Sequence, residues 1–205
     1  MRLTDFLNPE AIVTGLGTLG VVFTLFVEVG LLIGLVLPGD SLLFVAGLAA
    51  GTDALGFQLS LFTLLIFCPM AAFLGSELGY FIGARYGRSL FDRPDGRIFN
   101  QERVRYAEEW FNRYGPGKAI IFGRYIPIVR TLMSPLAGIL KMDKKKFTLW
   151  NALSALLWTS SILIIGFLLG ERVSGSIDKY LLPIVGSLIL ISMIPVLREL
   201  LKKKK

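Results

Sequence analysis

The chain has 205 residues, 54% of them hydrophobic and only 18% charged, with a mean hydropathy of +0.65. Ordinary soluble domains are about 25% charged, so the composition predicts a single membrane domain over residues 1–205. The net charge of +7 gathers between apolar segments and in the last residues, as orientation signals do, and we expect no nucleic-acid partner. The chain has no histidine and one cysteine. It therefore lacks the commonest general base and metal ligand, and we expect neither enzyme activity nor a metal or cofactor.

Five apolar regions follow one another along the chain. Three are long enough to cross a bilayer, which takes about 20 apolar residues. They predict transmembrane helices at 54–84, 147–170 and 180–197. The other two regions, 11–52 and 119–140, contain charges and prolines and do not fit simple spans.

Prolines divide these two regions into short arms. Pro38 and Gly39 leave a second arm of 40–52, which would reach only about 20 Å against a hydrocarbon core of about 30 Å. Pro127 leaves arms in the other region that are no longer than that. Because proline breaks the helical hydrogen-bond ladder, we predict two re-entrant helical hairpins, at 11–52 and 119–140. Kinked helices that span the membrane are the alternative.

Basic residues predict the orientation of these segments. They are abundant at 85–118, at 141–146 and in the tail, and scarce in the segments between. The positive-inside rule then places these three segments in the cytoplasm and the N-terminus outside. The two hairpins enter from opposite faces, each followed by a spanning helix. This arrangement is an inverted repeat with one extra helix, and such repeats place a transport site near the midplane.

Residues 100–114 are predicted to form an amphipathic helix. Val104, Ala107, Trp110, Phe111 and Tyr114 recur at helical spacing, with arginines on other faces. We expect this helix to lie on the inner membrane surface. Packing against the protein's own cytoplasmic side is an equal alternative.

Four charges lie inside the interrupted regions: Glu28, Asp40, Arg124 and Arg130. A charge near the bilayer centre costs roughly 2.5–3.5 kcal/mol on insertion scales, so such residues mark functional sites by default. A carboxylate that alternates between an apolar setting and an arginine partner could carry protons, and arginine binds phosphate through a rigid fork of donors. We predict a proton-handling Glu28/Asp40 pair and a phosphate-binding Arg124/Arg130 pair. The alternative is a pair of buried salt bridges that only hold the hairpins together.

Secondary candidates lie nearby. Glu77 could be a third titrating group, while the adjacent Gly75, Gly79 and Gly83 form a small-residue stripe that predicts close helix packing. Pro38, Gly39 and Pro127 would shape the hairpins. Asn151 and Trp158 share one face of the next helix, where a structural hydrogen bond and core packing are the simpler interpretations.

The same residues resemble the DedA family of the VTT-domain (SNARE-associated) superfamily, over nearly the whole chain. The matching residues are Glu28, Leu37-Pro38-Gly39-Asp40, Ala46-Gly47, Gly79-Tyr80 with Ile82-Gly83, Phe122-Gly123-Arg124-Tyr125 with Pro127 and Arg130, Ala137-Gly138, Met142, Phe147, Asn151 and Trp158. The resemblance implies two membrane-embedded hairpins and transport or scrambling of lipids, in bacteria notably the recycling of undecaprenyl phosphate. It also implies that the four charges occupy the positions that the family needs.

Two positions depart from the family pattern. Ser76 stands where the family often has Asp, and Ala84 where it often has Arg, although Glu77 and Arg85 are adjacent.

From the membrane charges and the family resemblance we expect a multi-pass transporter of the bacterial inner membrane that moves a phosphate-bearing lipid, most simply undecaprenyl phosphate, with protons as a candidate coupling ion. A transporter or scramblase of phospholipids such as phosphatidylethanolamine, and a proton-coupled carrier of a small solute, are the alternatives.

Overall fold

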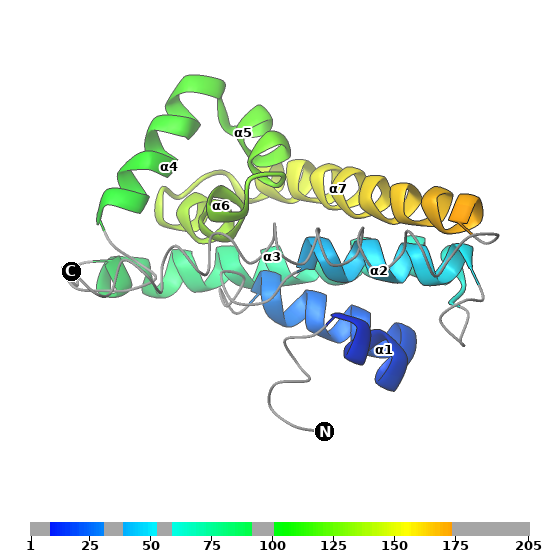
Figure 1. Cartoon of the computed structure of the whole chain (residues 1–205). Helices are drawn as coiled ribbons and strands as arrows, with labels where there is room; N and C mark the ends of the chain where they lie inside the picture. The colour runs from blue at the N-terminus through cyan, green and yellow to red at the C-terminus, as the bar shows by residue number, and fades with distance from the viewer. Residues whose placement is uncertain (1–8, 31–38, 53–58, 92–100, 174–205) are drawn as a thin grey trace, which may run out of the picture. The chain divides into compact units, whose positions relative to one another are not determined.

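The structure is a computed structural model that describes residues 9–30, 39–52, 59–91 and 101–173. Over these ranges it contains seven helices and no strands, which confirms the prediction of an all-helical chain for the part that is described. The predicted helix at 180–197 and Pro38 lie outside these ranges. The helices are α1 (Pro9–Gly30), α2 (Gly39–Gly51), α3 (Leu61–Phe91), α4 (Gln101–Tyr114), α5 (Pro116–Gly123), α6 (Pro127–Ile139) and α7 (Lys144–Val173) (Figure 1).

Two of these helices, α3 and α7, are long and apolar enough to cross a membrane, over Leu61–Gly87 and Lys144–Arg172. The predicted span at 54–84 thus begins later in the structure and continues to Phe91. Arg85 and Arg88 do not end the helix, because charged residues are good helix formers and can extend beyond the hydrocarbon core.

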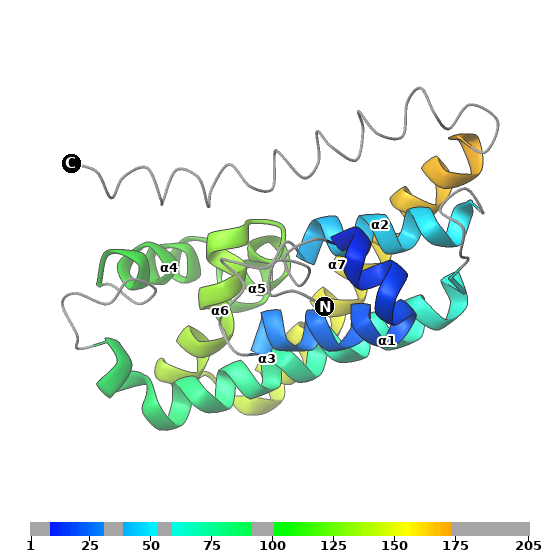
Figure 2. The same ribbon diagram turned by 60° about the horizontal axis from the view of Figure 1, so that its bottom comes forward.

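The described residues group into two compact units. Those of the first unit fall within Met1–Leu25, Leu35–Cys68 and Thr159–Lys205. Here α2 lies along the second half of α7 (Figure 2). Gly47 and Gly51 of α2 meet the backbone of α7, and Gly166 and Gly170 of α7 meet the backbone of α2, so closely that an added Cβ on any of them would overlap main-chain atoms. Small residues therefore set this helix contact.

The second unit comprises Phe26–Gly34 and Pro69–Trp158. In it α4, α5 and α6 pack on one another (Figure 1). The buried cluster that joins them contains Phe111 of α4, Ile120 of α5 and Leu132 of α6. The amphipathic helix predicted at 100–114 therefore turns Phe111 toward the protein. Contact of its other faces with the membrane surface stays a prediction.

The glycine stripe of α3 contacts helices in the second unit, as predicted. A Cβ on Gly83 would overlap the main chain of Pro135 in α6, and Gly138 of α6 lies equally close to the main chain of Tyr80. Gly75 touches the end of α1 at Phe26 and Gly30. These close approaches hold α6 and the end of α1 against α3.

The helix break that Pro127 predicts is present, whereas Pro69 and Pro135 lie inside α3 and α6. α5 ends at Gly123 and α6 begins at Pro127, where the missing N–H costs no intrahelical bond. With 8 and 13 residues, they are about 12 and 20 Å long, too short to span separately. A break that the sequence did not predict is the left-handed Gly17, which kinks α1 (φ 56°). Entry of the hairpins into the membrane and the inverted repeat stay predictions.

Candidate functional site

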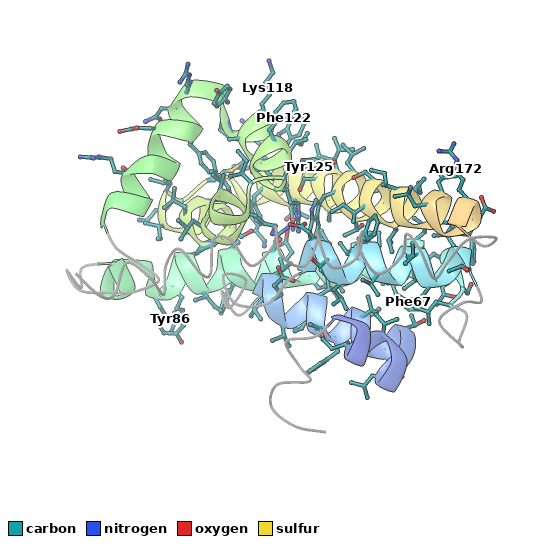
Figure 3. All side chains as sticks on the ribbon, in the orientation of Figure 1. Phe67, Tyr86, Lys118, Phe122, Tyr125 and Arg172 are labelled. Carbon is teal, nitrogen blue, oxygen red and sulfur yellow. The ribbon has the colours of Figure 1, made fainter. Side chains whose placement is uncertain are left out.

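The break between α5 and α6 places two arginines in the interior of the second unit. Arg124 follows the last residue of α5, and Arg130 lies in the first turn of α6. Their residues are only 5% and 8% exposed. The neighbouring Phe122 and Tyr125 point outward (Figure 3) and are 58% and 49% exposed. The short connection thus turns the arginines inward and the aromatic rings outward.

Arg124 donates hydrogen bonds to neutral groups on both long helices. Its Nη1 donates to Asn151 Oδ1 at 2.9 Å and Ser154 Oγ at 2.8 Å, both on α7. Its Nη2 donates to the carbonyl oxygen of Ala72 at 2.9 Å and to Ser76 Oγ at 2.8 Å, both on α3. The Nε of Arg124 has no hydrogen-bond partner among the described residues. One donor of this buried fork is therefore left over.

Arg130 is held by a carboxylate instead. Its Nη2 donates to Oε1 of Glu28 at 3.0 Å, and the side chains are 6% and 1% exposed. Glu28 comes from the end of α1, and the pair joins two segments 102 residues apart. Removing one member of such a buried pair leaves an uncompensated charge, which typically costs about 3–5 kcal/mol.

Trp158 brings the two arginines to one surface. Its ring is fully buried, and the guanidinium carbons of Arg130 and Arg124 lie 4.6 and 5.6 Å from its centroid. A cation over an indole face is worth about 2 kcal/mol or more when desolvated. The ring therefore stabilises two like charges that would otherwise repel each other.

A small cavity opens beside the arginines. Its lining residues are Ser76, Ile120, Arg124, Arg130, Met133, Ser134 and Phe147. The centre of a water molecule has about 10 Å³ of free space in it, close to the least that holds one water. Two buried cations and two hydroxyl groups thus line one cavity of water size, together with the apolar side chains of Ile120, Met133 and Phe147.

A second polar cluster extends from Asn151 to the start of α7. Asn151 Nδ2 donates to Oε1 of Glu77 at 3.0 Å and to the carbonyl oxygen of Phe73 at 3.1 Å. Glu77 also forms an ion pair with Lys144. Thr148 Oγ1 lies 3.4 Å from Oε2 of Glu77. Glu77 is therefore linked to Arg124 through a single amide group.

The structure places most of the predicted site residues in the second unit. Arg124, Arg130, Glu28, Glu77 and Asn151 form the connected set described above. Asp40 lies in the first turn of α2, in the first unit, and its contact with the arginines stays a prediction. The same turn begins with Gly39, and α6 begins with Pro127, so these two residues mark helix starts.

Sequence reasoning missed several contacts of this set. Ser154, Trp158, Lys144 and the carbonyl of Ala72 were not site candidates, and Ser76 was noted only as a departure from the family pattern. A signal was available on α7. Positions 144, 148, 151, 154 and 158 all carry side chains with polar groups and share one helix face, and the other residues from 147 to 157 are aliphatic or aromatic.

Known proteins that resemble this chain are membrane proteins. The family model of the VTT domain matches residues 37–168. Protein DedA of Escherichia coli is 34% identical over 88% of this chain and 80% of its own length. A membrane protein of Mycobacterium tuberculosis is 31% identical over 87% of this chain and 76% of its own. The inner membrane protein YqjA of Escherichia coli is 32% identical over 72% of this chain and 64% of its own.

No solved structure matches the chain significantly. The family match covers well over half of the sequence, and it includes α2, α3, α4, the two short helices, most of α7 and both arginines, while Glu28 lies before it. It also agrees with the two helices that can cross a membrane. The chain therefore belongs to the DedA family of VTT-domain membrane proteins.

Proposed function

We propose that this protein moves a phosphate-bearing lipid, undecaprenyl phosphate, between the leaflets of the bacterial inner membrane, without chemical change to the lipid. The observation that carries the proposal is the pair of buried guanidinium groups that share Trp158 and line one cavity. Arginine keeps its charge when desolvated and matches the geometry of phosphate oxygens. A membrane protein that maintains two such groups at one cavity is suited to an anionic headgroup.

The unpaired Nε of Arg124 is the first donor that a phosphate oxygen would meet. Arg130 becomes available only when the phosphate replaces the carboxylate of Glu28. The displaced carboxylate, which is almost fully buried, then lacks a counter-charge and takes up a proton. Phosphate binding and protonation of Glu28 are in this way coupled, with Asp40 as the second acidic group. The coupling ion is a proton.

Transport requires the cavity to widen, because a phosphate group is larger than a water molecule. The break between α5 and α6 is a suitable hinge, since three residues separate Gly123 from Pro127, and their N–H groups bond only to carbonyl oxygens three residues back, at 3.1–3.4 Å, a geometry poorer than that of the α-helix. Movement of α6 would carry Arg130, Met133 and Ser134 with it. The location in the inner membrane rests on the resemblance to YqjA, which is named an inner membrane protein.

The proposal is tested with purified protein in liposomes that contain labelled undecaprenyl phosphate and labelled phosphatidylethanolamine. We expect the first lipid to change leaflet and the second to stay. Arg130→Lys should slow the movement at least tenfold, whereas the matched surface variant Arg105→Lys should not, because Arg105 is exposed and only pairs with Glu109. Equal movement of both lipids would replace the proposal with a phospholipid scramblase, and movement of neither would remove lipid transport.

A second variant separates phosphate binding from a structural ion pair. Glu28→Gln combined with Arg130→Met removes both charges of the buried pair and should restore the stability that either single change loses. Transport should remain lost, because the donor to phosphate is gone. Full transport by this double variant would mean that Arg130 only neutralises Glu28.

A further inference from the structure

Among the described residues, no anion binds the buried cation Arg124 directly. In the part of the chain that the structure describes, its four hydrogen bonds all go to neutral acceptors. A buried charge is costly unless it is compensated. Arg130, by contrast, has the carboxylate of Glu28 beside it. The compensation of Arg124 must therefore come through another group.

The amide of Asn151 stands between Arg124 and a carboxylate. Its Oδ1 accepts from Arg124 Nη1 at 2.9 Å, while its Nδ2 donates to Glu77 Oε1 at 3.0 Å. The opposite orientation of the amide would direct its NH₂ at the guanidinium and its oxygen at the carboxylate, which would set donor against donor and acceptor against acceptor. The hydrogen bonds therefore allow only one orientation of the amide. Asn151 thus presents its oxygen to Arg124 because Glu77 binds its nitrogen.

Glu77 is itself fixed by the face of α7 that carries Asn151. Thr148 and Lys144, about one and two turns nearer the helix start than Asn151, both contact the carboxylate of Glu77. Glu77 is 18% exposed, whereas Lys144 is 54% exposed. The carboxylate therefore connects a half-exposed lysine to a fully enclosed amide and arginine.

We propose that Glu77 is a positioning residue for Arg124, which it orients and compensates through the side-chain amide of Asn151. The two buried arginines are then compensated in different ways, Arg130 directly by Glu28 and Arg124 by Glu77 through the amide of Asn151. The relayed pair leaves the guanidinium of Arg124 oriented but not covered by a carboxylate. The consequence for lipid binding rests on the function proposed above.

The rival role for Glu77 is a surface ion pair with Lys144 that only ties α3 to α7. The two roles predict different effects for two variants. Glu77→Gln removes the charge that orients Asn151, whereas Lys144→Met leaves that charge in place and removes only the ion pair. An exchange variant, Glu77→Gln with Asn151→Asp, moves the carboxylate next to Arg124 and keeps the net charge. It reverses the hydrogen bond between positions 77 and 151 and loses the one to the carbonyl oxygen of Phe73.

The test uses the full chain in detergent micelles with ¹⁵N-labelled arginine. The Nε–H resonance of Arg124 is assigned by its loss in Arg124→Lys. We expect Glu77→Gln to shift this resonance and leave that of Arg130 in place, Lys144→Met to shift neither, and the exchange variant to return the resonance toward its original position. An unmoved Arg124 resonance in Glu77→Gln, or an equal shift in Lys144→Met, would overturn the proposal.

Binding of undecaprenyl phosphate to the same variants gives the functional arm. We expect Glu77→Gln to weaken its affinity about tenfold, as loss of an outer partner does at other ligand sites, and the exchange variant to recover most of it. Were the Arg124 resonance to move while lipid affinity stayed constant, positioning by Glu77 would hold and phosphate binding by Arg124 would not. The two proposals can therefore fail separately.

Discussion

Arg124 and Arg130 carry the same group but are held by opposite kinds of partner. Arg124 spreads four hydrogen bonds over two helices and leaves one donor unused. Arg130 relies on the carboxylate of Glu28 and the face of Trp158. A planar fork is needed for the first arrangement, whereas a point charge can partly satisfy the second. The two residues should therefore respond differently to the same substitution.

Arg124→Lys should destabilise the protein more than Arg130→Lys. A single ammonium cannot reach acceptors on both α3 and α7, and buried acceptors left without a donor cost about 1–3 kcal/mol each. Arg130→Lys keeps a charge for Glu28 and should lower stability by about 1 kcal/mol or less, the range of an altered hydrogen bond. Thermal unfolding in detergent measures both, with Arg105→Lys as the surface control. Equal losses for Arg124 and Arg130 would contradict the difference described here.

The buried charges of the site and Asn151 were predicted from the sequence, whereas Ser154, Trp158 and Lys144 were not. Glu28, Arg124 and Arg130 stand out because a charge in an apolar stretch is costly. Ser154 and Trp158 look like ordinary packing residues of an apolar helix, and the carbonyl of Ala72 has no sequence signal at all. Their roles follow from helix register across α3 and α7, which only three-dimensional packing determines. The pairing of Glu28 with Arg130 rather than Arg124 also depends on that packing.

At the scale of helices, local signals predicted the break at Pro127 and the bounds of one helix, and they missed a second break. Pro127 starts α6 as its fixed φ angle favours, and the helix at 100–114 is found at Gln101–Tyr114. The kink at Gly17 was missed, because a glycine within an apolar run looks the same in a straight helix. The glycine stripe of α3 predicted close packing but not the partners, since several apolar helices could lie against it.

Gly83→Ala should separate α3 from α6, whereas Gly79→Ala should be tolerated. A methyl group at position 83 would overlap the main chain of Pro135, which cannot yield locally. At position 79 the nearest atom is Ser134 Cβ at 3.2 Å, a side-chain contact that a small shift relieves. Overpacking typically costs about 1–3 kcal/mol, and position 83 should reach the upper end. Unfolding in detergent compares the two variants, and a Gly79→Ala loss as large as that of Gly83→Ala would refute this account of the interface.

On the scale of the whole chain, α7 contributes residues both to the charged site and to the contact with α2. Its first half carries Lys144, Asn151, Ser154 and Trp158 to the charged site, and its second half packs on α2 through glycines. The residues of α7 therefore divide between the two compact units, up to Trp158 in the second and from Thr159 in the first. The basic residues at its start and its 24-residue uncharged stretch at 147–170 predict a spanning helix that begins in the cytoplasm.

Cysteine labelling along α7 and α3 tests this orientation. With Cys68→Ala as background, single cysteines replace Lys145, Arg172 and Tyr86, three exposed residues of which the last two point away from their helices in Figure 3. Positions 145 and 172 are roughly 40 Å apart along α7 at about 1.5 Å per residue, more than the hydrocarbon thickness of about 30 Å. An impermeant thiol reagent applied to intact cells should label position 172 alone, and positions 145 and 86 should react only after permeabilisation. Labelling of 145 and 86 but not 172 would reverse the orientation. Labelling of both 145 and 172 from outside would mean that α7 does not span, and the inverted repeat would fall with it.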